Sequence, residues 1–136
     1  MKTFTHDDIN LVIDSAKLHA KTVCDRLYNK VAEEIGGNEY FKAIIDRSFD
    51  YICDLEIQSL KEYFNMYFSK TSSLSAEEIK ELIDSRMSVQ SKLNLLASRG
   101  SNKKLTSISV AFINRSVIQA FVEMLAEYSG VEYHII

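Results

Sequence analysis

The chain contains no proline among its 136 residues, and this absence limits its fold more than any other feature. Average usage of about 5% would give roughly seven prolines in a chain of this length. Proline breaks a helix because it lacks the backbone N–H and because its ring clashes with the preceding turn. The sequence is therefore suited to long, uninterrupted helices, and we expect an all-α fold.

Apolar residues recur at helical spacing along four segments, which predict helices over residues 7–35, 38–69, 76–98 and 105–128. The first segment has a seam of nearly heptad spacing, formed by Ile9, Ile13, Ala16, Ala20, Val23, Leu27 and Val31. We predict a single domain over residues 1–136, folded as an antiparallel four-helix bundle. The first two helices would form a long hairpin.

Local signals mark where the predicted helices begin and end. Thr5 is a candidate N-cap for the first helix, and Gly36 and Gly37 are suited to ending it. Ser75 and Glu78 match the S-x-x-E capping box, in which each side chain bonds to the backbone N–H of the other residue. This capping box is the sharpest local signal in the sequence.

The uneven lengths of the predicted helices suggest that the chain associates with itself. The first two helices are longer than the last two, so part of their hairpin would lack a covering helix within one chain. The segment 105–128 is apolar on nearly all sides, which is typical of a central helix or of an interface. We therefore predict a homo-oligomer, with a homodimer as the simplest form.

The charge balance argues against a strong nucleic-acid footprint. The chain has 16 basic and 19 acidic residues, a formal net charge of -3, and nucleic-acid-binding domains usually carry a basic balance or face. Positive charge gathers without nearby acids only at Arg99, Lys103 and Lys104. Aromatic residues that could stack on bases are missing from this stretch. We interpret it as a helix connector, and a nucleic-acid-associated subunit using these three cations remains the alternative.

The residues that usually carry catalysis occur singly. The histidines His6, His19 and His134 lack the spacing of metal ligands, and the four glycines do not form a phosphate-binding loop. Cys24 and Cys53 do not make a disulfide framework, so we expect them to be reduced and partly buried. The sequence predicts no catalytic, cofactor or metal site, and therefore no enzyme.

Two groups of acidic residues have the spacing of a possible metal site. Asp46, Asp50 and Asp54 lie four residues apart, but they point away from the apolar face of their helix. The second group resembles the first carboxylate cluster of the all-α nucleoside triphosphate pyrophosphohydrolases, and it consists of Glu77, Glu78, Glu81 and Asp84. The E-x-x-D of the second cluster in that family is missing from the following helix, so we interpret both groups as solvated faces.

Three polar residues fall near apolar faces. Arg115 and Asn114 interrupt the most apolar segment, and Glu56 falls on the inward face of the second helix. Buried charges need partners, so an Arg115–Glu56 pair is one hypothesis. The alternative is that both residues emerge at the edge of the bundle, with their stems covering apolar surface. We treat all three as candidate buried or interface residues.

These patterns favour a binding protein. We expect a small, acidic, non-enzymatic regulator or inhibitor that acts by binding a protein partner, with a purely structural oligomer subunit as a further alternative. The first ten residues lack the apolar region of a signal peptide. We expect the longest apolar stretches to be far short of a membrane span. We therefore predict a cytoplasmic protein without membrane association.

Overall fold

The computed structural model describes residues 3–35, 39–97 and 104–130, though not the side chains of residues 34–35, 88–97 and 104–107. Within these ranges, four helices pack together, which confirms the predicted all-α class. The elements follow in the order β1 (Thr3–Phe4), α1 (His6–Ile35), α2 (Glu39–Phe68), β2 (Leu74–Ser75), α3 (Ala76–Ala97) and α4 (Lys104–Ser129). The helix bounds lie within one residue of the predicted ones, and α2 is continuous.

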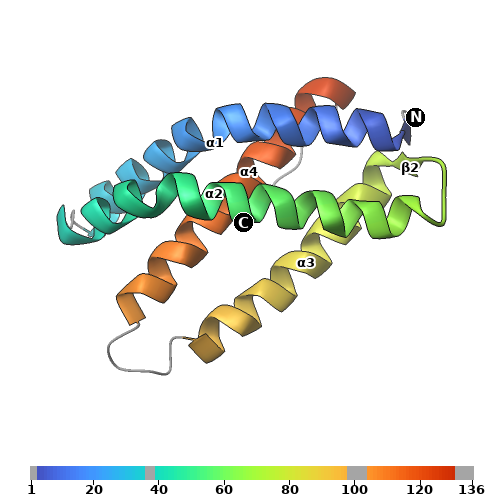
Figure 1. Cartoon of the computed structure of the whole chain (residues 1–136). Helices are drawn as coiled ribbons and strands as arrows, with labels where there is room; N and C mark the ends of the chain where they lie inside the picture. Colours follow the sequence, from blue (N-terminus) through green and yellow to red (C-terminus); the bar gives the residue numbers. More distant parts are fainter. Residues whose placement is uncertain (1–2, 36–38, 98–103, 131–136) are drawn as a thin grey trace.

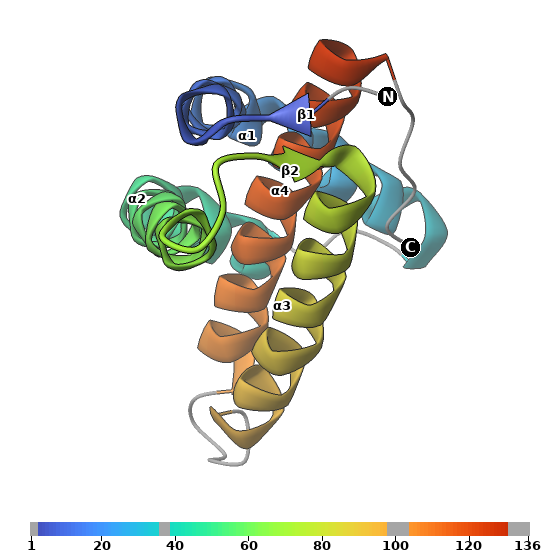
Figure 2. The same cartoon turned by 90° about the vertical axis from the view of Figure 1, so that its right-hand side faces the viewer.

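The four helices form two pairs that cross each other. α1 lies beside α2, and α3 lies beside α4 (Figures 1 and 2). The second pair crosses the first obliquely, so the four axes do not share one direction (Figure 1). α4 contacts each of the other three helices and is the central element.

Ion pairs run along the seam between α1 and α2. As the residue number rises along α1, the number of the partner residue on α2 falls. The pairs are partly exposed, so each contributes little stability on its own, but together they fix the register of the two helices. They are Asp14–Lys61 (2.7 Å), Lys17–Asp54 (3.2 Å), Lys21–Asp46 (2.9 Å) and Asp25–Lys42 (3.1 Å).

Both predicted N-caps are present. The N–H of Thr5 donates to the Asp8 carboxylate at 2.9 Å, and the N–H of Asp8 donates to the Thr5 hydroxyl at 3.2 Å. At the start of α3, the N–H of Ser75 donates to the Glu78 carboxylate at 3.0 Å, and the N–H of Glu78 donates to the Ser75 hydroxyl at 3.1 Å. Each box satisfies donors that a helix start leaves unpaired.

A short antiparallel bridge, which the sequence analysis did not predict, joins β1 to β2. It pairs Thr3 with Ser75 and Phe4 with Leu74, and it connects the start of α1 to the start of α3 (Figure 2). Phe4 and Leu74 are both buried in the core. The bridge therefore anchors the N-terminal segment to the second helix pair.

The core receives side chains from all four helices. The Phe64 and Phe121 rings stack with their centroids 5.6 Å apart, so α2 and α4 meet directly. A ring on α2 also packs edge-on against α4, where Phe41 and Phe112 lie 5.8 Å apart. The largest fully buried side chains are Phe4, Phe64, Phe121, Ile9, Ile13, Ile45, Leu60, Ile79, Ile83, Ile113, Leu125 and Val12.

Candidate docking surface

The most deeply buried charges of the described residues form one ion pair between α2 and α3. Glu56 and Arg86 are 4% and 9% exposed. One guanidinium nitrogen of Arg86 donates to Glu56 Oε2 at 2.9 Å, and the other donates to Glu56 Oε1. The second nitrogen also donates to the Ser59 hydroxyl at 2.9 Å. This two-pronged geometry compensates for part of the cost of burying the charges.

An aromatic ring completes the surroundings of this pair. The Arg86 guanidinium lies 5.8 Å from the centroid of the Tyr63 ring, and the Tyr63 hydroxyl donates to the backbone carbonyl of Leu82 at 2.8 Å. Burial, together with a hydrogen bond to Tyr67, raises the pKa of Tyr63 to about 12. The cluster links α2 to α3 through side chains and has a structural role.

The structure gives Glu56 a different partner from the one hypothesised. Glu56 is buried, but it pairs with Arg86 rather than with Arg115, because α3 supplies the cation nearest to its carboxylate. Arg115 is exposed and Asn114 is half-buried on α4. Of the three loop cations, Arg99 and Lys103 lie outside the described residues. Lys104 begins α4, and its side chain also lies outside them.

A second polar cluster, centred on Glu123, joins α1 to α4. The carboxylate accepts hydrogen bonds from Arg26 (3.2 Å to Oε1) and Gln119 (3.0 Å to Oε2), and His19 Nε2 lies 3.1 Å from Oε1. Burial alone would raise the pKa of Glu123, but the hydrogen bonds outweigh it and lower that pKa to about 2. Glu123 therefore remains ionised at neutral pH.

The two cysteine thiols are free and buried. Burial raises the pKa of Cys53 to about 11, with the Asp54 charge adding to the effect. Burial also raises the pKa of Cys24, against a hydrogen bond to Ser116 that lowers it. A thiol must ionise to act as a nucleophile, so neither cysteine is suited to covalent chemistry at neutral pH.

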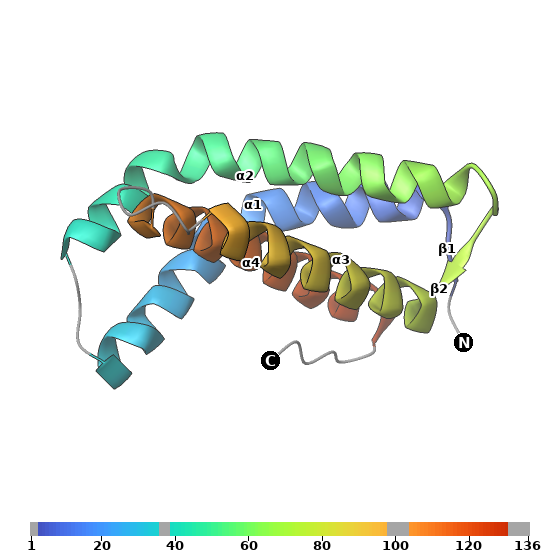
Figure 3. The ribbon, with the colours of Figure 1, turned by 90° about the horizontal axis from the view of Figure 1, so that it is seen from below.

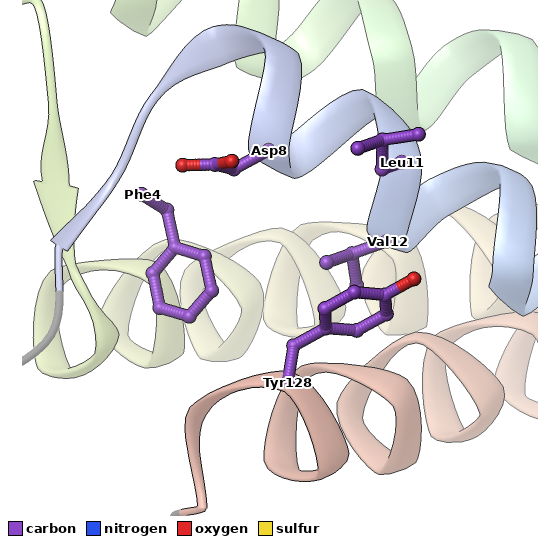
Figure 4. A pocket seen from close by; sticks show the side chains of 5 residues that line it. All are labelled: Phe4, Asp8, Leu11, Val12 and Tyr128. Atoms are coloured by element: carbon purple, nitrogen blue, oxygen red, sulfur yellow. The ribbon is translucent and has the colours of Figure 1, made fainter.

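A groove with an apolar floor lies between α1 and the last turns of α4. In one part of it, the Tyr128 side chain reaches from α4 towards Val12 on α1, with the Phe4 ring beside them (Figure 4). This hollow measures ≈ 40 Å³ and is also lined by Asp8 and Leu11. It is too small for a drug-sized ligand, which typically occupies about 300 Å³ or more.

A second, wider hollow shares Tyr128 with the first as a lining residue. This hollow measures ≈ 330 Å³ and is lined by Ser15, Met124, Glu127 and Tyr128. The Ser15 and Tyr128 hydroxyls lie 3.4 Å apart and connect the two walls. We call the surface lined by Asp8, Leu11, Ser15, Met124, Glu127 and Tyr128 the α1–α4 groove.

Large apolar side chains are exposed on the α1 wall of the groove and next to it. Leu11 is 57% exposed, and Leu18, seven residues later on the same face of α1, is 87% exposed. Tyr128 is 46% exposed on the α4 wall. Glu127 is an exposed acid beside it. The surface combines exposed apolar side chains with the acids Asp8 and Glu127, which suits a peptide or helix better than a small molecule.

Two further features bear on function. Within the described ranges, no three His, Cys, Asp or Glu side chains are grouped so that they could hold a metal ion. The segment Ile108–Ser129 of α4 is long and apolar enough to cross a membrane by length and composition, so the expectation that every apolar stretch falls short was wrong. However, 56% of that segment is buried in the fold, as is typical of a core helix.

The α1–α4 groove could not be located from the sequence, because the sequence does not say which helices are neighbours. Leu11 and Leu18 are readable as apolar residues on the polar side of the first helix, but Tyr128 joins them only through the fold.

No protein-family model, curated protein or solved structure matches this chain.

Proposed function

We propose that this chain is a non-enzymatic binding protein that docks a protein partner in the α1–α4 groove. The observation that carries the proposal is the exposure of Leu11 and Tyr128 on facing walls of an open groove. Large apolar side chains that remain exposed together mark interaction surfaces more often than scattered ones do. A regulator or inhibitor would act by binding its protein partner at the α1–α4 groove.

The chemistry of the groove indicates the kind of partner. Glu127 lies at its edge and Asp8 lines its narrower end, while the whole chain carries a net charge of -3. A fitting partner segment would be amphipathic, with apolar side chains facing Tyr128 and basic side chains facing the acids. Complementary charge of this kind mainly improves the rate and the specificity of association.

The finer architecture is part of the same proposal. We infer that α1 and α2 form a long antiparallel hairpin, supported by the ion pairs along the α1–α2 seam. The two hairpin helices have 30 residues each, against 22 for α3 and 26 for α4. We also propose a cytoplasmic location. The apolar side chains of α4 would then pack in the protein core and not in a membrane.

The proposal is tested by capturing partners from the source cells with tagged protein. Wild-type protein should retain a specific protein, and Leu11→Glu and Tyr128→Glu should each lose it, because a carboxylate placed in the groove disfavours an apolar segment. Glu81→Lys is a matched control, since Glu81 is exposed on α3. Circular dichroism should show that all variants remain folded. Equal retention by the groove variants would contradict the proposal.

A second measurement distinguishes this proposal from the alternative, a nucleic-acid-associated subunit. Arg99, Lys103 and Lys104 offer three phosphate contacts per chain, fewer than the roughly six to ten that give strong salt-dependent binding. We therefore expect labelled duplex and single-stranded oligonucleotides to bind more weakly than about 1 μM at 200 mM salt. Tighter binding that is lost when all three cations become alanine would favour the alternative.

A further inference from the structure

The outer face of α2 carries a second exposed apolar surface, separate from the α1–α4 groove. α2 lies along one edge of the molecule (Figure 3). Its exposed large apolar residues are Tyr40, Tyr51, Leu55 and Met66, whose exposed fractions are 66%, 69%, 51% and 52%. At about 100° per residue, all four fall within roughly 80° of the helix circumference. We call this surface the α2 stripe.

The spacing of the α2 stripe is symmetric. Successive members are 11, 4 and 11 residues apart, so the pattern reads the same in both directions about position 53. If two copies of α2 pack in opposite directions about a two-fold axis at that position, Tyr51 of each copy faces Leu55 of the other. Tyr40 then faces Met66 in the same way. A two-fold interface requires such self-complementarity.

The charges on the same face also fit a two-fold packing. Arg47 lies on the N-terminal half of the stripe and Glu62 on the C-terminal half, and both are exposed. In the antiparallel arrangement, Arg47 of one copy would lie about three residues along the axis from Glu62 of the other, or ~4.5 Å. An arginine side chain can span that offset. Because of the two-fold axis, the Arg47–Glu62 pair would occur twice in the interface.

A second acid lies near the proposed axis. Asp54 is on the edge of the stripe that faces α1, so the two copies would bring two such carboxylates near each other. Lys17 Nζ lies 3.2 Å from Asp54 within each chain, which offsets this repulsion. The balance of charges around the stripe therefore favours the two-fold packing.

We propose that the α2 stripe is the contact surface of a reversible homodimer of this chain. The first and last residues of the stripe, Tyr40 and Met66, lie 26 positions apart, or ~39 Å along the helix axis. A contact strip ~10 Å wide would bury on the order of 800 Å² in total, which is below the ~1,200–2,000 Å² of stable specific complexes. The dimer should thus dissociate at low concentration. It uses a different surface from the groove, so the two proposals can fail independently.

Sedimentation equilibrium between about 1 and 100 μM tests the dimer. The wild-type mass should rise from monomer to dimer across this range, and the midpoint should fall in the micromolar region typical of small interfaces. Tyr51→Glu and Leu55→Glu should each remain monomeric at 100 μM. Leu18→Glu, which changes an exposed leucine on α1, should dimerise like the wild type. Circular dichroism checks that each variant is folded.

A charge exchange identifies the partner as a second copy in the proposed orientation. Arg47→Glu and Glu62→Arg should each weaken self-association, because each places like charges opposite one another. An equimolar mixture of these two variants should form a heterodimer more strongly than either variant forms a homodimer, since both charge pairs are then restored. A wild-type chain that stays monomeric at 100 μM would overturn the proposal. So would a dimer unaffected by Tyr51→Glu and Leu55→Glu, or a mixture no stronger than its components.

Discussion

Glu56 and Arg86 are buried charges, and their burial is tolerated only because they form an ion pair with each other. Removing one partner from such a pair leaves an uncompensated charge, which typically costs about 3–5 kcal/mol. We therefore expect Arg86→Ala and Glu56→Ala each to lower the free energy of unfolding by roughly that amount. Urea denaturation of the purified variants measures this loss.

Arg115→Ala is the matched control for these two variants. Arg115 is an exposed arginine on α4, and exposed substitutions usually change stability by less than about 0.5 kcal/mol. If Arg86→Ala cost no more than Arg115→Ala, the buried pair would not have the structural role assigned to it.

Glu123 makes the stability of the fold depend on pH. Its pKa in the folded chain is about 2, against an ordinary value of 4.5. A lowered carboxyl pKa stabilises the fold above the ordinary value, and this contribution disappears as the pH falls from about 4.5 towards 2. Because Arg26 is half exposed, solvent screening should reduce the effect to about 1–2 kcal/mol.

Urea midpoints at pH 5, 4 and 3 test this contribution. The wild type should lose more stability across this range than Glu123→Gln, in which the titrating group is absent. Glu127→Gln changes an exposed acid one helical turn away and should follow the wild type. Parallel curves for the wild type and Glu123→Gln would refute the role of Glu123.

Single residues were only partly predictable from the sequence. Spacing placed Glu56 on the inward face of its helix, and this position is confirmed by its burial. The partner Arg86 was overlooked, although it stands seven residues after the buried Ile79 and three after the buried Ile83. That spacing put Arg86 on the inward face of α3. The choice between Arg86 and Arg115 depends on which helices meet, and helical spacing alone does not contain this information.

At the scale of elements, the start of α3 depends on the Ser75–Glu78 capping box. Loss of an N-cap side chain costs about 1 kcal/mol in typical helices, so we expect Ser75→Ala to lower the free energy of unfolding by about that amount. Glu78→Ala should cost somewhat less, because it removes one hydrogen bond and one favourable charge near the helix start. Thermal denaturation followed by circular dichroism measures both.

Glu81→Ala serves as the control for the capping variants. Glu81 is exposed one turn further into α3, so its removal should have a smaller effect than either cap substitution. Equal losses in Glu78→Ala and Glu81→Ala, with none in Ser75→Ala, would show that acidic charge, and not the capping geometry, stabilises the helix.

The helices were predictable as elements, whereas the β1–β2 bridge was not. Long apolar periodicity and caps fix helix bounds because these signals are local. A strand of two residues has no detectable period, and its pairing partner lies about 70 residues away in the sequence. Only the fold brings Phe4 beside Leu74.

At the scale of the whole molecule, the sequence predicted four packed helices but not their crossing. Ridge-into-groove packing permits several crossing angles between helices, and the side chains at each contact select among them. The α1–α4 groove is a result of that selection, since it forms where the last turns of α4 pass the first turns of α1. A surface made by two segments more than 100 residues apart could not be read from local patterns.

The central position of α4 has a consequence for how the chain folds during translation. α4 is the last of the four helices along the chain, yet it supplies the surface on which the other three pack. While a ribosome is still translating this segment, the emerging α1, α2 and α3 would expose the apolar faces that α4 covers in the complete fold. Such exposed intermediates are prone to aggregate. We therefore expect the nascent chain to be most prone to aggregation until the residues of α4 have left the exit tunnel.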